Sequence, residues 1–171
     1  MRLEIASTWD GLPARPDERV HLTLSATPAA LRIAVDAPFH GDPPPPGAPG
    51  PCWRLWEHEV VELFVVGPDE HYTEVELSPH GHHLLLRLEG TRQVVEKMLP
   101  MDFSADIHGA RWQGVALLPW DCLPPTPRRG NAFAIHGCGT SRRHLAASPL
   151  PGPQPDFHQL DRFPVLRLPV P

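Results

Sequence analysis

Proline occupies 24 of the 171 positions and is spread along the whole chain. Because proline removes a backbone donor and clashes inside a helix, at a cost of about 3 kcal/mol, this spread excludes a long helical bundle, a coiled coil or a TIM barrel. Disorder is not indicated, since 41% of residues are hydrophobic and they come in distinct runs. We therefore expect one globular domain over residues 1–171, with proline-rich connections.

Composition also limits the partners that the chain is expected to have. With 15 basic and 20 acidic residues the net charge is −5, which argues against nucleic-acid binding. The apolar runs are only a few residues long, far from the roughly 20 that cross a membrane. Residues 1–11 have no apolar signal core, so a cytoplasmic protein is expected. Cys52, Cys122 and Cys138 lack paired spacing and are expected to be free thiols.

Apolar residues alternate with polar ones in short runs, the pattern of β-strands with one buried face. Residues 21–25 and 31–35 predict a hairpin, and the runs 60–66, 72–77 and 83–88 predict a three-stranded meander. Further strands are expected near Leu3 and Ile5 and over residues 93–98, 103–107, 112–118, 132–137 and 165–168. The predicted fold is all-β, an antiparallel β-sandwich of the immunoglobulin or jelly-roll kind with about 9–11 short strands.

Two proline-rich stretches, residues 40–51 and 149–155, cannot pair within a sheet and are expected to be surface loops. The first leads into Trp53 and Trp56, and the second leads into Phe157 and His158. Proline restricts the conformations of such segments, which lowers the entropic cost of holding a binding site open.

Seven carboxylates and no lysine or arginine lie between residues 57 and 76. In the predicted strands Glu74 and Glu76 share a face, Arg87 on the next strand can face them, and Glu62 sits inside an apolar strand. Three interpretations remain open. The cluster forms a cross-strand ion-pair ladder with Arg87, which we favour; it binds calcium or another hard cation; or it supplies the paired carboxylates of a glycosidase.

The tryptophans and one histidine suggest a binding site. Trp53 and Trp56 lie between the first proline-rich loop and the acidic strand, where exposed indole rings can stack on a sugar face. A core position is the competing interpretation for each of them. His158 lies between Phe157 and the following loop, and it is either a site residue or a structural cap.

Several stretches resemble one family. Residues 55–65 resemble the tryptophan- and acid-containing strand of family 9 carbohydrate-binding modules and the wider DOMON-like group. Further motifs of that group are resembled, in the same order, by residues 72–81, 112–123, 131–135 and 156–163. The resemblance implies a β-sandwich that binds a sugar or, in some DOMON members, haem, without catalysis. It also implies aromatic side chains that hold a terminal sugar and calcium ions that support the fold.

We therefore predict a non-catalytic domain that binds a carbohydrate or a related small polar ligand. The predicted ligand-binding residues are Trp53, Trp56, Glu62, Glu74, Glu76, Arg87 and His158. A haem-binding DOMON-type module is the first alternative, with Met98 and Met101 and His136, His144 or His158 as axial ligands. A glycosidase-like enzyme that uses Glu62 and Glu74 or Glu76 is the second.

Overall fold

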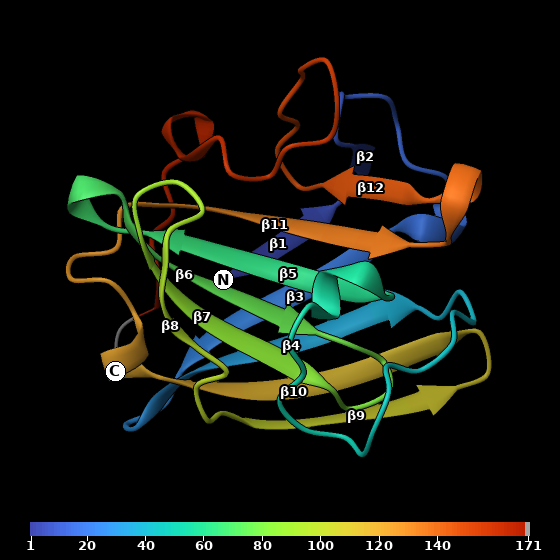
Figure 1. Ribbon diagram of the computed structural model, residues 1–171, viewed down its shortest axis with the longest axis horizontal. Coiled ribbons are helices and arrows are strands. Elements are labelled where there is room, and N and C mark those ends of the chain that lie inside the picture. The colour runs from blue at the N-terminus through green and yellow to red at the C-terminus, as the bar shows by residue number, and fades with distance from the viewer. Residues whose placement is uncertain (170–171) are drawn as a thin grey trace.

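The computed structural model describes residues 1–169 and consists of two antiparallel β-sheets packed face to face (Figure 1). The five-stranded sheet has the order β1-β3-β4-β10-β9, with β1 Arg2–Ile5, β3 Val20–Ala26, β4 Ala30–Pro38, β9 Asp102–His108 and β10 Arg111–Pro119. The seven-stranded sheet has the order β2-β12-β11-β5-β6-β7-β8, with β2 Ser7–Thr8, β5 Val60–Val66, β6 His71–Leu77, β7 His83–Glu89, β8 Val94–Lys97, β11 Arg129–His136 and β12 Arg143–Ala146. The predicted antiparallel β-sandwich is confirmed.

Helical structure in residues 1–169 is limited to short 3₁₀ turns. They are η1 Pro16–Glu18, η2 Leu55–Glu57, η3 Pro68–Glu70, η4 Trp120–Cys122, η5 Gly139–Ser141 and η6 Leu160–Arg162. Residues 40–51 form a loop, as predicted. A bridge between Pro51 and His83 joins the loop to β7, and the ring of His40 stacks on that of His136 at the end of β11.

The main core lies between the two sheets. Alternation in β3 turns Leu22 and Leu24 inward, and β4 contributes Ile33 in the same way. The facing sheet contributes Val65 and Val75, among others. Each fully buried aliphatic side chain stabilises the fold by roughly 1.5–3 kcal/mol relative to exposure, so this layer holds the sandwich together.

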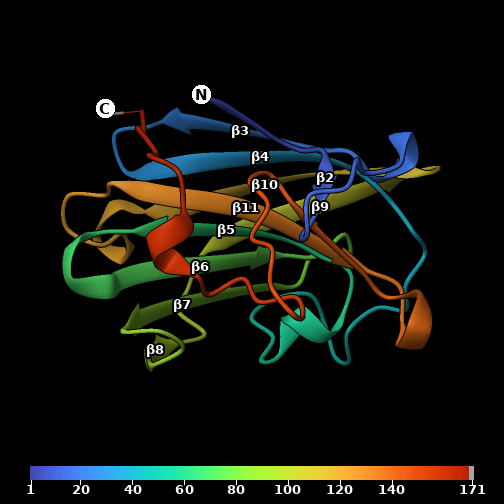
Figure 2. The same ribbon diagram turned by 90° about the horizontal axis from the view of Figure 1, so that it is seen from above.

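A second core covers the outer face of the seven-stranded sheet and explains why every residue of β5 is buried. Phe64, Tyr72 and Phe133 project from that face, and the chain after β12 returns over them with Phe157 and Phe163. Figure 2 shows this C-terminal segment lying beside β11, β5 and β6. The sheet is therefore covered on both faces, and the candidate site forms at the edge of the second covering layer.

Local alternation predicted the hairpin β3–β4 and the meander β5–β6–β7 correctly. The expected strand at 165–168 is wrong, because only one bridge, from Val165 to Arg129, ties that segment to the sheet. Pro164 and Pro169 flank it, and proline cannot donate to a ladder. Leu166 is buried against Gly130 instead.

Candidate functional site

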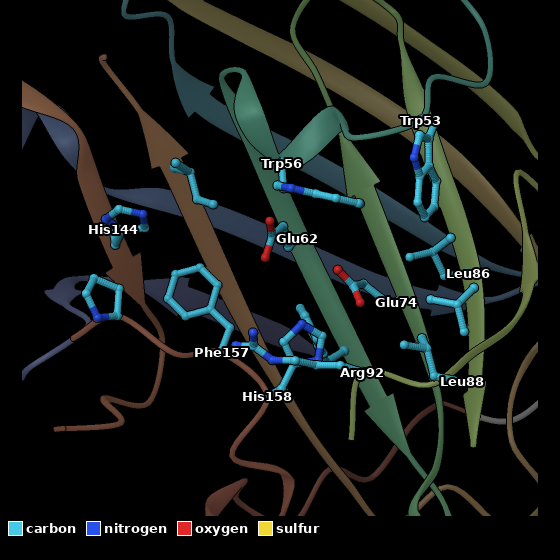
Figure 3. Close-up of a pocket in the computed structure, with 14 residues that line it drawn as sticks. Trp53, Trp56, Glu62, Glu74, Leu86, Leu88, Arg92, His144, Phe157 and His158 are labelled. Atoms are coloured by element: carbon cyan, nitrogen blue, oxygen red, sulfur yellow. The ribbon is translucent and has the colours of Figure 1, made fainter. Parts of the chain in front are cut away.

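A cavity of about 490 Å³ opens on the outer face of the seven-stranded sheet (Figure 3). Its volume falls within the usual range for small-molecule sites. Its lining comes from β5, β6, β7, β8, β11 and β12, from the turn between β7 and β8, from the segment around η2, and from the C-terminal segment. The lining residues are Trp53, Trp56, Glu62, Phe64, Glu74, Leu86, Leu88, Arg92, Val94, Ile135, His144, Pro155, Phe157 and His158. The cavity is therefore mostly apolar and aromatic, with a small number of polar groups.

Two indole rings form one wall. The rings of Trp53 and Trp56 meet edge to face, with centroids 5.2 Å apart and planes at 80°. Arg54 between them has φ of 65°, in the left-handed region that non-glycine residues rarely adopt, and this turns the chain between the two rings. Trp53 is 40% exposed, which is high for so large an apolar ring. The pair thus presents aromatic surface to solvent and to the cavity.

Arg142 fixes the position of this wall. Its guanidinium donates to the backbone carbonyls of Trp56, Glu57 and Gly137, so it ties η2 to the end of β11. Five donors in a rigid plane suit such multiple contacts better than the single ammonium of lysine. Arg142 acts through Trp56 and is not itself among the lining residues.

The opposite wall comes from the C-terminal segment. Phe157 stacks on Phe133 of β11, with centroids 4.0 Å apart and planes at 9°, and the ring of His144 meets Phe157 edge-on. Arg92, in the turn between β7 and β8, forms an ion pair with Asp156, with Nη2 and Oδ1 2.7 Å apart. These contacts connect the turn, the sheet and the C-terminal segment around the cavity.

A hydrogen-bonded chain orients His158. The backbone N–H of Arg92 donates to Oη of Tyr72 at 3.0 Å, and Oη lies 2.8 Å from Nδ1 of His158. Burial, and the nearby charge of Arg92, lower the pKa of His158 to about 4, although Asp156 acts in the other direction. The imidazole is therefore neutral at pH 7. Since Oη accepts from the amide, its one proton is free to reach Nδ1, and Nε2 then carries the imidazole proton.

Two carboxyl groups, those of Glu62 and Glu74, lie on the cavity floor, and Glu76 is their buried neighbour. Glu62 pairs with Glu76 across β5 and β6, and Glu74 is the next residue of β6 on the same face. Their residues are 2%, 0% and 4% exposed. In residues 1–169 no hydrogen bond or ion pair reaches Glu62, and both oxygens of Glu76 lack a partner. Figure 3 shows the carboxyl groups of Glu62 and Glu74 pointing into the cavity.

The environment favours the protonated forms of these acids. Burial raises the pKa of Glu74 to about 7. Burial also raises the pKa of Glu62 well above its usual value, and the charge of Glu74 adds to this while Arg142 opposes it. For Glu76, burial and then the charges of Glu62 and Glu74 raise the pKa in the same direction. Desolvation is thus the dominant cause in all three groups.

The expected ion pairing of these acids with Arg87 is wrong. Arg87 lies opposite Thr73 in the register of β6 and β7, whereas Glu74 and Glu76 lie opposite Leu86 and Leu84. Arg87 therefore emerges on the other face, where it forms an ion pair with Glu96 at 2.6 Å. It does not line the cavity. The structure brings together Trp53, Trp56, Glu62, Glu74 and His158 around the cavity, whereas Glu76 lies beside Glu62 outside the lining.

Several lining residues escaped the sequence-based predictions. Phe64 shares the parity of Glu62 in β5, and that signal was sufficient to include it. Tyr72 is not among the lining residues, but its parity with Glu74 in β6 could likewise have shown its place beside the site. Arg92 gave no such signal, because its position depends on a turn. His144 was named only as a possible haem ligand, and its place beside this cavity depends on a strand far along the chain.

The residues that a metal ion or a haem group would need are only partly present around the cavity. Among residues 1–169, no group of three or more histidine, cysteine or acidic side chains is arranged to hold a metal ion. Of the proposed haem ligands, His144 and His158 line the cavity. Met101 is buried in the core between the sheets, and His136 lies beside Glu18.

Similarity to known proteins identifies the family. The mouse UPF0462 protein C4orf33 homolog is 44% identical over 172 residues, covering 95% of this chain and 89% of the mouse protein. The chain belongs to the UPF0462 family. The human UPF0462 protein C4orf33 is 42% identical over 172 residues, covering 95% of this chain and 86% of its own length. The zebrafish homolog is 40% identical over 174 residues, with 95% and 87% covered.

One solved structure shares the fold of this UPF0462 chain. A protein from Bacteroides uniformis ATCC 8492, described as a "putative carbohydrate-binding protein", superposes with a TM-score of 0.75 over 96% of this chain and 84% of that one. At 15% identity the likeness shows the fold alone. No family model matches the chain. The resemblance of the UPF0462 chain to family 9 modules and DOMON domains stays a prediction. No helix within residues 1–169 has the length and apolar character needed to span a bilayer.

Proposed function

We propose that this UPF0462 chain binds a saccharide in the cavity between Trp53, Trp56 and His158. The observation that carries the proposal is the perpendicular, partly exposed indole pair beside two buried carboxyl groups that point into the same space. Indole faces stack on the C–H surfaces of a sugar ring, and carboxyl groups bond its hydroxyl groups. The shared fold with a protein described as a "putative carbohydrate-binding protein" supports the same conclusion.

Binding without catalysis is the form of the function that we favour. A glycosidase needs one ionised carboxylate beside one protonated acid, which requires environments that push the two pKa values apart. Here burial shifts the pKa of Glu62, Glu74 and Glu76 in the same direction, and within residues 1–169 no cation forms an ion pair with Glu62 or Glu74 that would keep one of them ionised. Assays with aryl-glycosides test this directly, because turnover that is lost in Glu62→Gln would establish hydrolysis instead.

Calorimetric titration with a panel of mono- and disaccharides tests the proposed binding. We expect at least one sugar to bind the wild-type chain and to lose about tenfold in affinity, or roughly 1.4 kcal/mol, when Trp53 is replaced by alanine. Leu12→Ala is the matched control, since Leu12 is 63% exposed and lies outside the cavity lining. Folded protein that binds none of the sugars would overturn the proposal.

A further inference from the structure

The carboxyl group of Glu62 on the cavity floor has no partner within residues 1–169. Glu62 is 2% exposed, points into the cavity and meets no hydrogen-bond or ion-pair partner in the described part of the chain. A buried carboxyl without a partner is costly, and a cluster of three is more so. A ligand that supplies the missing partner would gain the interaction energy that the fold leaves unused.

The neighbouring guanidinium groups do not fill that role. Arg142 acts on Glu62 through its charge, but its donors are engaged with three backbone carbonyls. Arg92 acts on Glu74 in the same way, and its Nη2 is paired with Asp156 at 2.7 Å. Both groups hold the cavity walls in place, so the acids on the floor remain without a direct cationic contact.

The rim of the cavity also suits a cation. Aromatic faces attract ammonium groups through the ring quadrupole, most strongly when the cation is partly desolvated. Trp53 already makes such a contact, because Nζ of Lys97 lies 4.7 Å from its ring centroid. Lys97 does not line the cavity, so that contact is made without occupying the space above Glu62 and Glu74.

We propose that the saccharide bound here carries a protonated amino group, which sits over Glu62 and Glu74 beneath the indole pair. This proposal rests on the proposed function and specifies its ligand class as amino sugars. The sugar ring stacks on the aromatic wall while the ammonium group donates hydrogen bonds to the floor carboxyl groups. Its charge favours their ionised forms, so a carboxyl group that is protonated in the free protein releases its proton to solvent on binding. A neutral hexose can stack on the indole rings but offers no positive charge to Glu62 and Glu74. An N-acetylated sugar replaces the ammonium group with a bulkier neutral amide.

Matched ligands separate this proposal from the general one. Glucosamine, galactosamine and mannosamine are each titrated at pH 7 by calorimetry beside the parent hexose and the N-acetyl derivative. We expect one amino sugar to bind at least about tenfold more tightly than both of its neutral counterparts, as hydrogen bonds to charged groups imply. In Glu62→Gln the ratio of the affinity for the amino sugar to that for its parent hexose should fall to near one. Glu74→Gln is a second variant with the same expectation. Circular dichroism verifies that both variants fold.

The outcomes are distinguishable. Equal affinity for an amino sugar and its parent hexose would overturn the amino-sugar proposal and leave saccharide binding in place. A preference for the amino sugar that survives in both glutamine variants would also overturn it, because the carboxyl groups would then not be the partner. Absence of binding by any sugar to folded protein would remove both proposals.

Discussion

Oη of Tyr72 lies 2.8 Å from Nδ1 of His158, and this contact joins β6 to the C-terminal segment across 86 positions of sequence. The same hydroxyl accepts the backbone N–H of Arg92. One phenol group thus fixes two walls of the cavity, and it also determines which imidazole nitrogen carries a proton.

Tyr72→Phe should therefore loosen the site without removing a lining side chain. Loss of Oη leaves the Arg92 amide and the imidazole of His158 unpaired, so the free energy of unfolding should fall by about 1–3 kcal/mol. A double-mutant cycle with His158→Phe, followed by urea unfolding, isolates the contact. In the wild type, ¹⁵N NMR should show the Nε2–H tautomer of His158. A neutral Nδ1–H tautomer would contradict this arrangement.

The buried acids should make stability depend on pH. Burial raises the pKa of Glu76 above its unfolded value near 4.5, so the protonated form is favoured in the folded state. The stabilisation is complete below about pH 4.5 and is lost as the pH rises. We expect Glu76→Gln to raise the free energy of unfolding by at least about 1 kcal/mol at pH 8 and to change it little at pH 4.

Glu70→Gln is the matched control, because Glu70 is exposed in η3. Its effect should be small at both pH values. If Glu76→Gln destabilised the protein equally at pH 4 and pH 8, the carboxyl group of Glu76 would not be the strained group that the structure indicates.

Glu18 should have the opposite pH dependence. Burial alone would raise the pKa of Glu18, but hydrogen bonds from Arg143 and from the Arg15 amide outweigh it and lower the pKa to about 2. Its contribution is complete above the unfolded pKa near 4.5 and is lost as the pH falls towards 2. Glu18→Gln should cost about 2–3 kcal/mol at pH 7, measured by urea unfolding.

The exposed pair of Glu4 with Arg19 provides the comparison for Glu18. Glu4→Gln should change stability by less than about 1 kcal/mol, since both side chains are about half exposed. A Glu18→Gln variant as stable as Glu4→Gln at pH 7 would show that the buried pair with Arg143 contributes nothing.

Arg142 should influence binding without touching the ligand. Arg142→Gln breaks the contacts that hold Trp56 and Glu57, so saccharide affinity should fall several-fold while Trp56 remains present. The aromatic signature of the paired indoles in near-ultraviolet circular dichroism should weaken as well. Arg162→Ala, which removes a single contact to Pro151, serves as the control and should leave both measurements unchanged.

Local patterns predicted the strands well because alternation and turn chemistry act over a few residues. The same patterns placed Trp53, Trp56, Glu62 and Glu74 near one another, since the meander brings adjacent segments together. Arg87 shows where that reasoning stops. Arg87 was correctly assigned to the face of β7 opposite to Leu84, Leu86 and Leu88. Which residues of β6 lie on that same face depends on the register set by the turn, where Leu77 pairs with His83.

The second core accounts for the remaining differences. Both faces of β7 carry leucine, so the sequence could not show which face lies towards the other sheet. The C-terminal segment that covers the outer face contributes Phe157 and His158, which lie more than 60 residues after Arg92 in the sequence. Arg92 contacts this segment through its ion pair with Asp156. Such long-range packing leaves no short-range periodicity to detect.

The indole N–H signals of the five tryptophans give the most direct test of the proposed site. In a ¹H–¹⁵N NMR titration with a saccharide that binds, the signals of Trp53 and Trp56 should shift with a common dissociation constant. Those of Trp9, Trp112 and Trp120, which lie outside the cavity lining, should stay in place. Shifts confined to the latter three, with Trp53 and Trp56 unmoved at saturation, would contradict saccharide binding in this cavity.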